Sequence, residues 1–145
     1  MAACLEHAAT LYRESVAMAI PSFRVVVVDD DAATMDMLCH LLTDEGYHVR
    51  CCSKHDQVIT IIRSEQPDLV ILDLRLAQPG RGWTILRAMR QDPLLAGIRV
   101  IVCTADSKYR PGQAEELRAL GCDVVFKPFE IDELCAKVDM TLRAD

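Results

Sequence analysis

The stretch Arg24-Val-Val-Val-Val-Asp-Asp-Asp31 sets four β-branched apolar residues directly before three carboxylates. Continuous apolar runs of this kind are typical of strands that are buried on both faces of a parallel sheet. Three adjacent negative charges repel one another unless a positive group lies among them. The stretch therefore predicts a buried strand whose end carries a cation or a basic side chain.

Length and composition indicate one globular domain. The chain has 145 residues, of which 51% are apolar and 26% charged, and its net charge is −6. The negative charge and the lack of a Lys/Arg cluster argue against a nucleic-acid-binding surface. No apolar run reaches the roughly 18 residues of a membrane helix, and no secretory signal pattern begins the chain. We expect a cytoplasmic protein without membrane insertion.

Short β-rich runs alternate with longer runs of helical periodicity, which is the pattern of a parallel sheet wound with helices. The predicted strands are Arg24–Val28, Tyr47–Cys51, Leu69–Leu72, Arg99–Cys103 and Asp123–Phe126. We expect an α/β fold of the doubly wound, flavodoxin-like type, a three-layer sandwich with five parallel strands in the order 2-1-3-4-5. Residues 23–145 are expected to form this domain, and residues 1–22 an N-terminal extension.

Apolar stripes with a spacing of three and four residues predict helices that face the core. The three clearest stripes comprise Met35, Leu38, Leu41 and Leu42; Val58, Ile61 and Ile62; and Ile131, Leu134, Cys135, Val138 and Leu142. Gly46 and Gly121 are placed to end helices, and Pro111 is placed to begin one.

Cysteine and histidine give no sign of a metal site. There are seven cysteines and four histidines, without a CxxC pair and without ligand spacing between the two residue types. An odd number of cysteines within mostly apolar segments is typical of buried, reduced thiols. We therefore expect free thiols and neither a disulfide framework nor a zinc site.

Polar residues follow four of the five predicted strands. They are Asp29, Asp30 and Asp31 after the first strand, Asp73 after the third, Thr104 after the fourth and Lys127 after the fifth. Parallel strands end at one rim, and ligands bind there at the point where the strand order reverses. Clustered carboxylates on such a rim suit Mg²⁺, which prefers oxygen ligands. A cation between Asp30 and Asp73, together with Lys127, would balance the three adjacent carboxylates.

This set of groups fits phosphoryl transfer to a carboxylate. Mg²⁺ and a lysine neutralise the phosphoryl oxygens and allow an anionic nucleophile to approach. The hydroxyl of Thr104 could donate a hydrogen bond to one of these oxygens. There is no GxxxxGK[ST] loop and no GxGxxG motif, so a bound nucleotide is not indicated.

At this point the sequence resembles the receiver domain of two-component response regulators, in particular the single-domain, chemotaxis-regulator type. The matching motifs are VVVVDDD (25–31), PDLVILDLRL (67–76), VIVCTA (100–105) and VVFKPFEIDEL (124–134). Each motif alone is weak, but four of them stand in order at the expected strand ends. The resemblance covers essentially all of residues 24–143.

The resemblance implies a metal site and a phosphoacceptor. Asp73 matches the phosphoacceptor, and Asp30 matches the direct Mg²⁺ ligand. Asp29 matches a neighbour that acts mostly through water, and Asp31 a less critical third carboxylate. The backbone carbonyl of Arg75 matches the remaining protein ligand to the metal.

The resemblance also assigns roles to two residues across the rim. Thr104 is similar to the switch hydroxyl, and Lys127 to the lysine that pairs with the phosphoryl group. In the family the bond between Lys127 and Pro128 is usually cis, which an X-Pro bond permits at low cost. Without the resemblance, the aspartates could merely cap a helix, Thr104 could be a turn residue and Lys127 a solvated lysine.

The sequence departs from the family at several positions. Ala77 replaces a common proline, and the loops after Asp73 and Thr104 look longer than usual. Val124 stands where the family has its switch aromatic, for which Phe126 or Tyr109 could substitute. Even so, we expect the surface formed by the last strand and the two helices beside it to respond to phosphorylation.

Two variable positions beside the site carry opposite charge. Arg75 lies two residues beyond Asp73, and Asp106 lies two residues beyond Thr104. The sequence predicts that the side chains of Arg75 and Asp106 pair across the opening and limit the access of attacking water.

The sequence thus predicts a stand-alone receiver that takes a phosphoryl group from a phosphohistidine onto Asp73 with Mg²⁺. Its expected partners are a sensor histidine kinase or phosphotransfer protein and a downstream protein, without direct nucleic-acid binding. It would catalyse only its own phosphorylation and dephosphorylation. One alternative is a pseudo-receiver, a phosphorylation-independent interaction module. Another is a Mg²⁺-dependent phosphohydrolase, but Leu74-Arg75-Leu76 supplies no acid for a leaving group.

Overall fold

The structure, a computed structural model, describes residues 22–75, 80–104 and 112–144. Its strands are β1 (Arg24–Val28), β2 (His48–Cys52), β3 (Leu69–Asp73), β4 (Arg99–Thr104) and β5 (Cys122–Phe126). Its helices are α2 (Ala32–Asp44), α3 (Val58–Glu65), α4 (Arg81–Gln91), α5 (Gln113–Ala119) and α6 (Ile131–Arg143), with a 3-10 turn, η1 (His55–Gln57), before α3.

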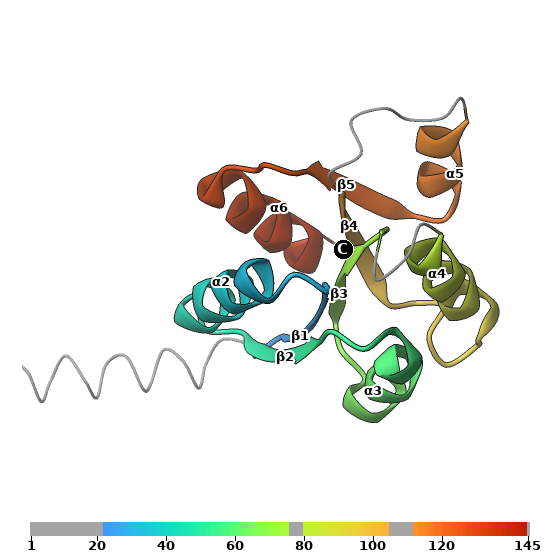
Figure 1. Cartoon of the computed structure of the whole chain (residues 1–145), viewed down its shortest axis with the longest axis horizontal. Helices are drawn as coiled ribbons and strands as arrows, with labels where there is room; N and C mark the ends of the chain where they lie inside the picture. Colours follow the sequence, from blue (N-terminus) through green and yellow to red (C-terminus); the bar gives the residue numbers. More distant parts are fainter. Residues whose placement is uncertain (1–21, 76–79, 105–111, 145) are drawn as a thin grey trace, which may run out of the picture.

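The strands form one parallel sheet in the order β2-β1-β3-β4-β5, as the sequence predicted. Helices α2 and α6 cover one face, and α3, α4 and α5 cover the other (Figure 1). The strand order reverses between β1 and β3, so the carboxyl ends of these two strands flank the position where ligands bind in folds of this type.

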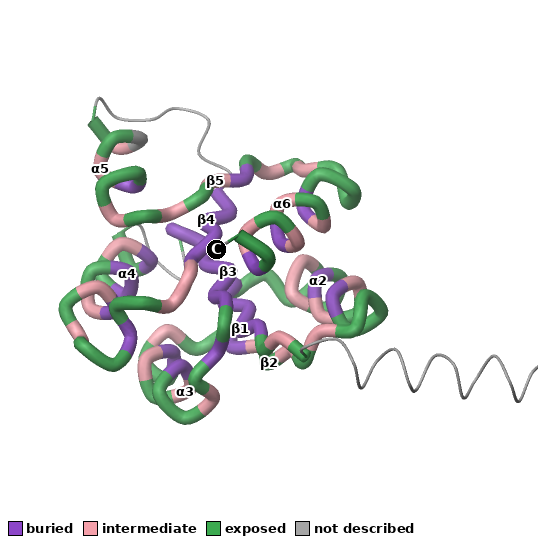
Figure 2. The backbone as a smooth tube through the Cα atoms, turned by 180° about the vertical axis from the view of Figure 1, so that it is seen from behind, coloured by how far each residue is buried: buried purple, intermediate pink, exposed green. Residues whose placement is uncertain are grey.

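The β-branched run of β1 explains the three layers, because successive side chains of a strand point to opposite faces. Val25 and Val27 pack with the apolar residues of α2 and α6, whereas Val26 and Val28 pack with those of α3, α4 and α5. All four valines are at most 1% exposed. In Figure 2 the buried positions run along the central strands and along the inner sides of the helices.

Several boundaries differ by one residue from the predicted ones. β3 and β4 include Asp73 and Thr104 as their last residues, and β2 is shifted one residue towards the carboxyl end. These polar residues continue the strand because their backbone groups still pair with the neighbouring strand. The predicted core position of Ile131 is wrong: its side chain is 49% exposed, because this first residue of α6 lies before the part of the helix that packs on the sheet.

The expectation of reduced thiols is wrong for two cysteines. Cys39 of α2 and Cys51 of β2 form a disulfide, with Cα atoms 6.9 Å apart. Cys52, Cys103, Cys122 and Cys135 are free. The sequence could not show this pair, because the two residues meet only when α2 packs over the edge strand β2.

Candidate functional site

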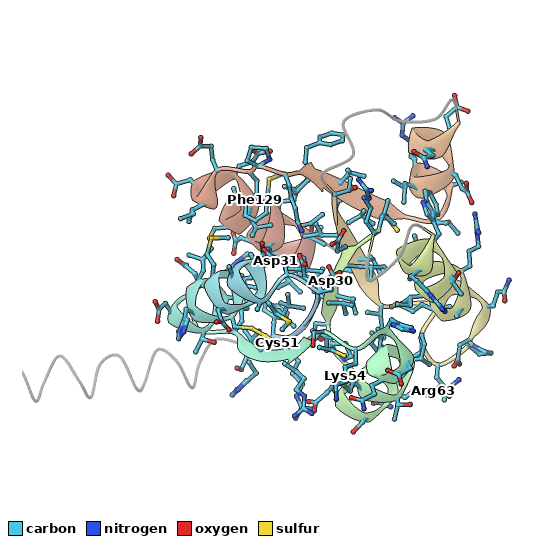
Figure 3. All side chains as sticks on the ribbon, in the orientation of Figure 1. Asp30, Asp31, Cys51, Lys54, Arg63 and Phe129 are labelled. Carbon is cyan, nitrogen blue, oxygen red and sulfur yellow. A yellow bond between two sulfur atoms is a disulfide. The ribbon has the colours of Figure 1, made fainter. Side chains whose placement is uncertain are left out.

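The acidic run divides into three different environments at the end of β1. Asp29 is 2% exposed, while Asp30 and Asp31 are exposed. Asp31 is the N-cap of α2, and one of its carboxylate oxygens accepts the Thr34 N–H at 3.1 Å. Its own N–H donates to the Asp29 carboxylate at 2.9 Å. Helix capping therefore accounts for Asp31, which Figure 3 labels next to Asp30 at the start of α2. The carboxylates of Asp29 and Asp30 are left to form the rim with Asp73.

Asp73 faces these carboxylates from the neighbouring strand. It ends β3, is 7% exposed, and accepts the N–H of Arg75 at 3.0 Å on one carboxylate oxygen. The register of β1 and β3 places Val28 beside Leu72, so Asp29 and Asp73 follow at the same level of the sheet. The predicted convergence of the first and third strand ends is thus present.

Lys127 supplies the positive charge that the acidic run requires. Its Nζ lies 2.6 Å from a carboxylate oxygen of Asp29 and 3.6 Å from one of Asp73. The Lys127 N–H donates to the carbonyl of Thr104 at 2.8 Å, which holds the start of the following loop against β4. The bond between Lys127 and Pro128 is cis, as expected from the resemblance.

The charges of this cluster shift one another's protonation. Burial raises the pKa of Asp73, and the charges of Asp29 and Asp30 act in the same direction. The Arg75 N–H and Lys127 oppose this rise. For Lys127, burial acts to lower the pKa, but its hydrogen bond to Asp29 and the charge of Asp73 outweigh burial and raise it. Lys127 therefore stays charged beside the carboxylates of Asp29 and Asp73.

The donor set fits a hard divalent cation. Asp29, Asp30 and Asp73 each bring a carboxylate oxygen to within 4.8 Å of the others. Mg²⁺ commonly binds one or two carboxylates and keeps water in its other positions, so such an open cluster of oxygens suits it. The raised pKa of Asp73, caused first by burial and further by the charges of Asp29 and Asp30, is consistent with a place for added positive charge.

The remaining predicted site residues lie around this pocket. Thr104 ends β4 and is 1% exposed, one residue beyond Cys103, which pairs with Asp73 across the sheet. Arg75 is exposed beside Asp73. Ala77, Asp106 and Tyr109 lie outside the described residues, so pairing of Arg75 with Asp106 stays a prediction.

Two backbone features of the site were not foreseen from the sequence. A Cβ atom at Gly82 would lie 2.4 Å from the Cα of Leu74 and 2.5 Å from the carbonyl oxygen of Asp73, so only glycine fits at this position. The Asp29 N–H donates to the carbonyl of Cys52 at 3.3 Å. A glycine soon after an acidic strand end was a possible signal for the first feature, but nothing in the sequence marks the second.

Comparison with known families decides what this arrangement is. The model of the response regulator receiver domain matches residues 25–139. The chain belongs to this family. The receiver is a signalling domain of two-component systems, and its acidic pocket is compatible with Mg²⁺. Within the described ranges, no helix of the receiver is long and apolar enough to cross a membrane.

A curated relative agrees with this assignment, and solved structures agree with the fold. The receiver is 36% identical over 121 residues to the DNA-binding response regulator MtrA of Mycobacterium tuberculosis, covering 83% of this chain and 50% of that protein. It thus spans about half the length of the curated relatives. Chemotaxis response regulator CheY4 of Vibrio cholerae has a TM-score of 0.74 at 21% identity, with 83% and 99% of the two chains covered.

A second solved structure has the same fold. The CheY-like receiver domain protein of Methanospirillum hungatei has a TM-score of 0.71 at 24% identity, covering 84% of this chain and 94% of that one. At these identities the two structures support the five-stranded, flavodoxin-like fold alone.

Proposed function

We propose that the receiver accepts a phosphoryl group on Asp73 from a phosphohistidine of a histidine kinase or phosphotransfer protein. The observation that carries this proposal is the position of Lys127, whose Nζ lies between the carboxylates of Asp29 and Asp73 at 2.6 and 3.6 Å. A purely structural ion pair would need one carboxylate. Here a lysine and three convergent carboxylates share one rim, which suits an anionic group that arrives from outside.

The proposed step exchanges one bond to phosphorus for another. A carboxylate oxygen of Asp73 attacks phosphorus, and the bond between phosphorus and the imidazole nitrogen breaks with its electron pair left on that nitrogen. Lys127 holds its ammonium group against the phosphoryl oxygens, and Thr104 donates its hydroxyl. Asp29, Asp30 and the carbonyl of Arg75 would hold Mg²⁺. When bound, Mg²⁺ supplies positive charge that neutralises the transferring group.

A groove beside Lys127 is where we propose that the phosphodonor protein docks. It has a volume of about 440 Å³ and is lined by Thr34, Met37, Lys127, Pro128 and Phe129. Met37 is 39% exposed on α2. A partner helix that fills this groove would bring its histidine next to Asp73, because Lys127 belongs both to the groove and to the pocket.

A docking role can be separated from chemistry by one substitution. Met37→Lys places a charge in the groove and should slow phosphorylation by a protein donor, while leaving phosphorylation by acetyl phosphate unchanged. Met140→Lys is a matched control, since Met140 is 70% exposed on α6 and does not line the groove. If Met37→Lys slowed phosphorylation equally with the protein donor and with acetyl phosphate, Met37 would support the acidic pocket and would not contact the docked protein.

We propose that the output surface comprises α5, β5 and α6. Val124, at the family's aromatic position, is partly buried against the core, whereas Phe126 two residues later is 42% exposed on the same strand. An exposed ring next to Lys127 in sequence can respond to a change in that lysine's partners. Backbone chemical shifts of β5 and α6 should therefore change on phosphorylation, and unchanged shifts would contradict this.

The second candidate is a phosphorylation-independent interaction module, which the aliphatic residue at position 124 favours. Intact-mass spectra after incubation with acetyl phosphate separate the two candidates. We expect one added phosphoryl group with Mg²⁺, none after chelation, and none in Asp73→Asn. A folded wild-type protein that gains no mass under these conditions would support the interaction module.

A further inference from the structure

We propose that Cys39 and Cys51 form a reversible thiol–disulfide exchange site whose redox state sets the affinity of the acidic pocket for a divalent cation. The two cysteines come from two elements that adjoin the acidic run. α2 begins directly after the run and carries Cys39, and β2 is the edge strand beside β1 and carries Cys51. Figure 3 shows the disulfide near the labelled Cys51, where α2 lies over β2.

The pair is accessible, in contrast to two of the free cysteines. Cys39 and Cys51 are both half-buried, whereas Cys52 and Cys103 are 4% and 1% exposed. No strand covers the outer edge of β2 in the described sheet. Because thiol–disulfide exchange requires a thiolate to approach one sulfur in line with the bond, access decides which cysteines react.

Both ends of the disulfide connect to the acidic run through short backbone routes. Cys51 lies beside Val27 in the sheet, and the carbonyl of the next residue, Cys52, accepts the Asp29 N–H at 3.3 Å. On the other side, Asp31 caps α2 while its N–H binds the Asp29 carboxylate. The disulfide closes a covalent loop of residues 39–51, from α2 to β2, and this loop is joined to the acidic run by the hydrogen bond from Asp29 to Cys52 and by the Asp31 cap of α2.

Reduction would open this loop of residues 39–51. Leu38 and Leu42 would still anchor α2 in the core. The covalent link between α2 and β2, however, would be lost, and these are the two elements that contact the acidic run through the Asp31 cap and the hydrogen bond from Asp29 to Cys52. Metal affinity depends on how firmly the surrounding structure holds the ligands. We expect the affinity for Mg²⁺ to fall about fivefold, the lower end of the range for coupled sites.

The exchange needs only thiols and disulfides. In reduction, a thiolate of a dithiol attacks one sulfur of the protein disulfide and forms a mixed disulfide, while the other cysteine leaves as a thiolate. The second thiol of the reductant then attacks the mixed disulfide and frees the first cysteine. Two electrons and two protons pass to Cys39 and Cys51, and the reductant becomes a disulfide. In oxidation, a small disulfide accepts the same electrons and protons and leaves as two thiols.

Calorimetric titration of the full chain with Mg²⁺ alone tests the proposal. Wild-type protein is equilibrated with a dithiol or with a small disulfide, and peptide mass mapping establishes the state of the Cys39–Cys51 pair. The Kd for Mg²⁺ should be about fivefold higher for the reduced form. Cys39→Ser should have the higher Kd under both conditions, while Cys135→Ser, a free cysteine on α6, should behave as wild type.

Two results would overturn the proposal. One is an equal Kd for the oxidised and reduced wild-type protein, which needs no variant and so does not depend on whether Cys39→Ser folds. The other is the absence of the linked peptide after oxidation. Neither readout requires phosphorylation, so a failure of the proposed phosphoacceptor role and a failure of the redox coupling can be told apart.

Discussion

Gly82 offers the sharpest test of how the fold positions the phosphoacceptor. It is the second residue of α4, and its N–H donates to the carbonyl of Leu74 at 3.1 Å. In Gly82→Ala the new Cβ would lie 2.4 Å from the Cα of Leu74 and 2.5 Å from the carbonyl oxygen of Asp73. Ordinary contacts begin near 3.4 Å, so the start of α4 or the end of β3 must move by about 1 Å (3.4 − 2.4).

The cost of this movement can be worked out from its parts. Overpacking against a rigid backbone costs about 1–3 kcal/mol, and weakening the hydrogen bond to Leu74 adds about 1 kcal/mol. We expect the free energy of unfolding to fall by about 2–4 kcal/mol. Because a shift of about 1 Å at a reacting group can cost about 100-fold in rate, phosphorylation should slow far more than stability alone explains.

Urea unfolding and the rate of phosphorylation by acetyl phosphate measure the two effects. Gly97→Ala is the matched control, because a Cβ at this position meets no atom within 4 Å and its φ is outside the positive region. The control should stay within about 0.5 kcal/mol of wild type. The reasoning is refuted if Gly82→Ala has the stability and rate of Gly97→Ala.

Three further predictions concern stability. Lys127→Met leaves the buried Asp29 without the ammonium group that lies 2.6 Å from it, so the free energy of unfolding in metal-free buffer should fall by about 2–3 kcal/mol. Mg²⁺ should restore part of this loss. An unchanged urea midpoint would argue against a stabilising pair of Lys127 and Asp29. Because the pKa of Lys127 is raised above 10.5, its stabilising contribution is complete below pH 10.5 and is lost as the pH rises through the higher folded-state pKa. The urea midpoint of wild type should therefore drop above pH 10.5 more than that of Lys127→Met, and parallel curves would contradict this. Reduction of the Cys39–Cys51 disulfide, which joins residues 12 apart, should lower the free energy of unfolding by about 3 kcal/mol, and identical unfolding curves with and without a dithiol would speak against it.

The fold was predictable because the apolar pattern of each strand can be recognised in the sequence without its neighbours. The run 25–28 is apolar at every position, which is expected only where both faces of the strand are covered. Once the alternation with helices was recognised, the strand order placed Asp29 and Asp73 on one rim. Boundaries were less certain, since Asp73 and Thr104 look like the first residues of loops but still pair as strand residues.

Contacts that depend on how closely a helix packs on a strand were out of reach from the sequence. The disulfide depends on the angle at which α2 packs against β2, and the fit of Gly82 depends on how closely α4 approaches the end of β3. The hydrogen bond from Asp29 to the carbonyl of Cys52 involves backbone atoms alone, which residue types do not reveal. The structure alone showed that Asp31 caps α2 and that Asp29 is buried against Lys127.

The most direct test of the central claim is the chemical identity of residue 73 after phosphorylation. Borohydride reduces an aspartyl phosphate to homoserine and leaves free aspartate unchanged, so peptide sequencing by mass spectrometry can locate the acyl phosphate. After treatment with acetyl phosphate and Mg²⁺, we expect homoserine at position 73 and at no other aspartate. Homoserine at Asp29 or Asp30, or aspartate retained at position 73 in a protein that has gained a phosphoryl group, would contradict the account.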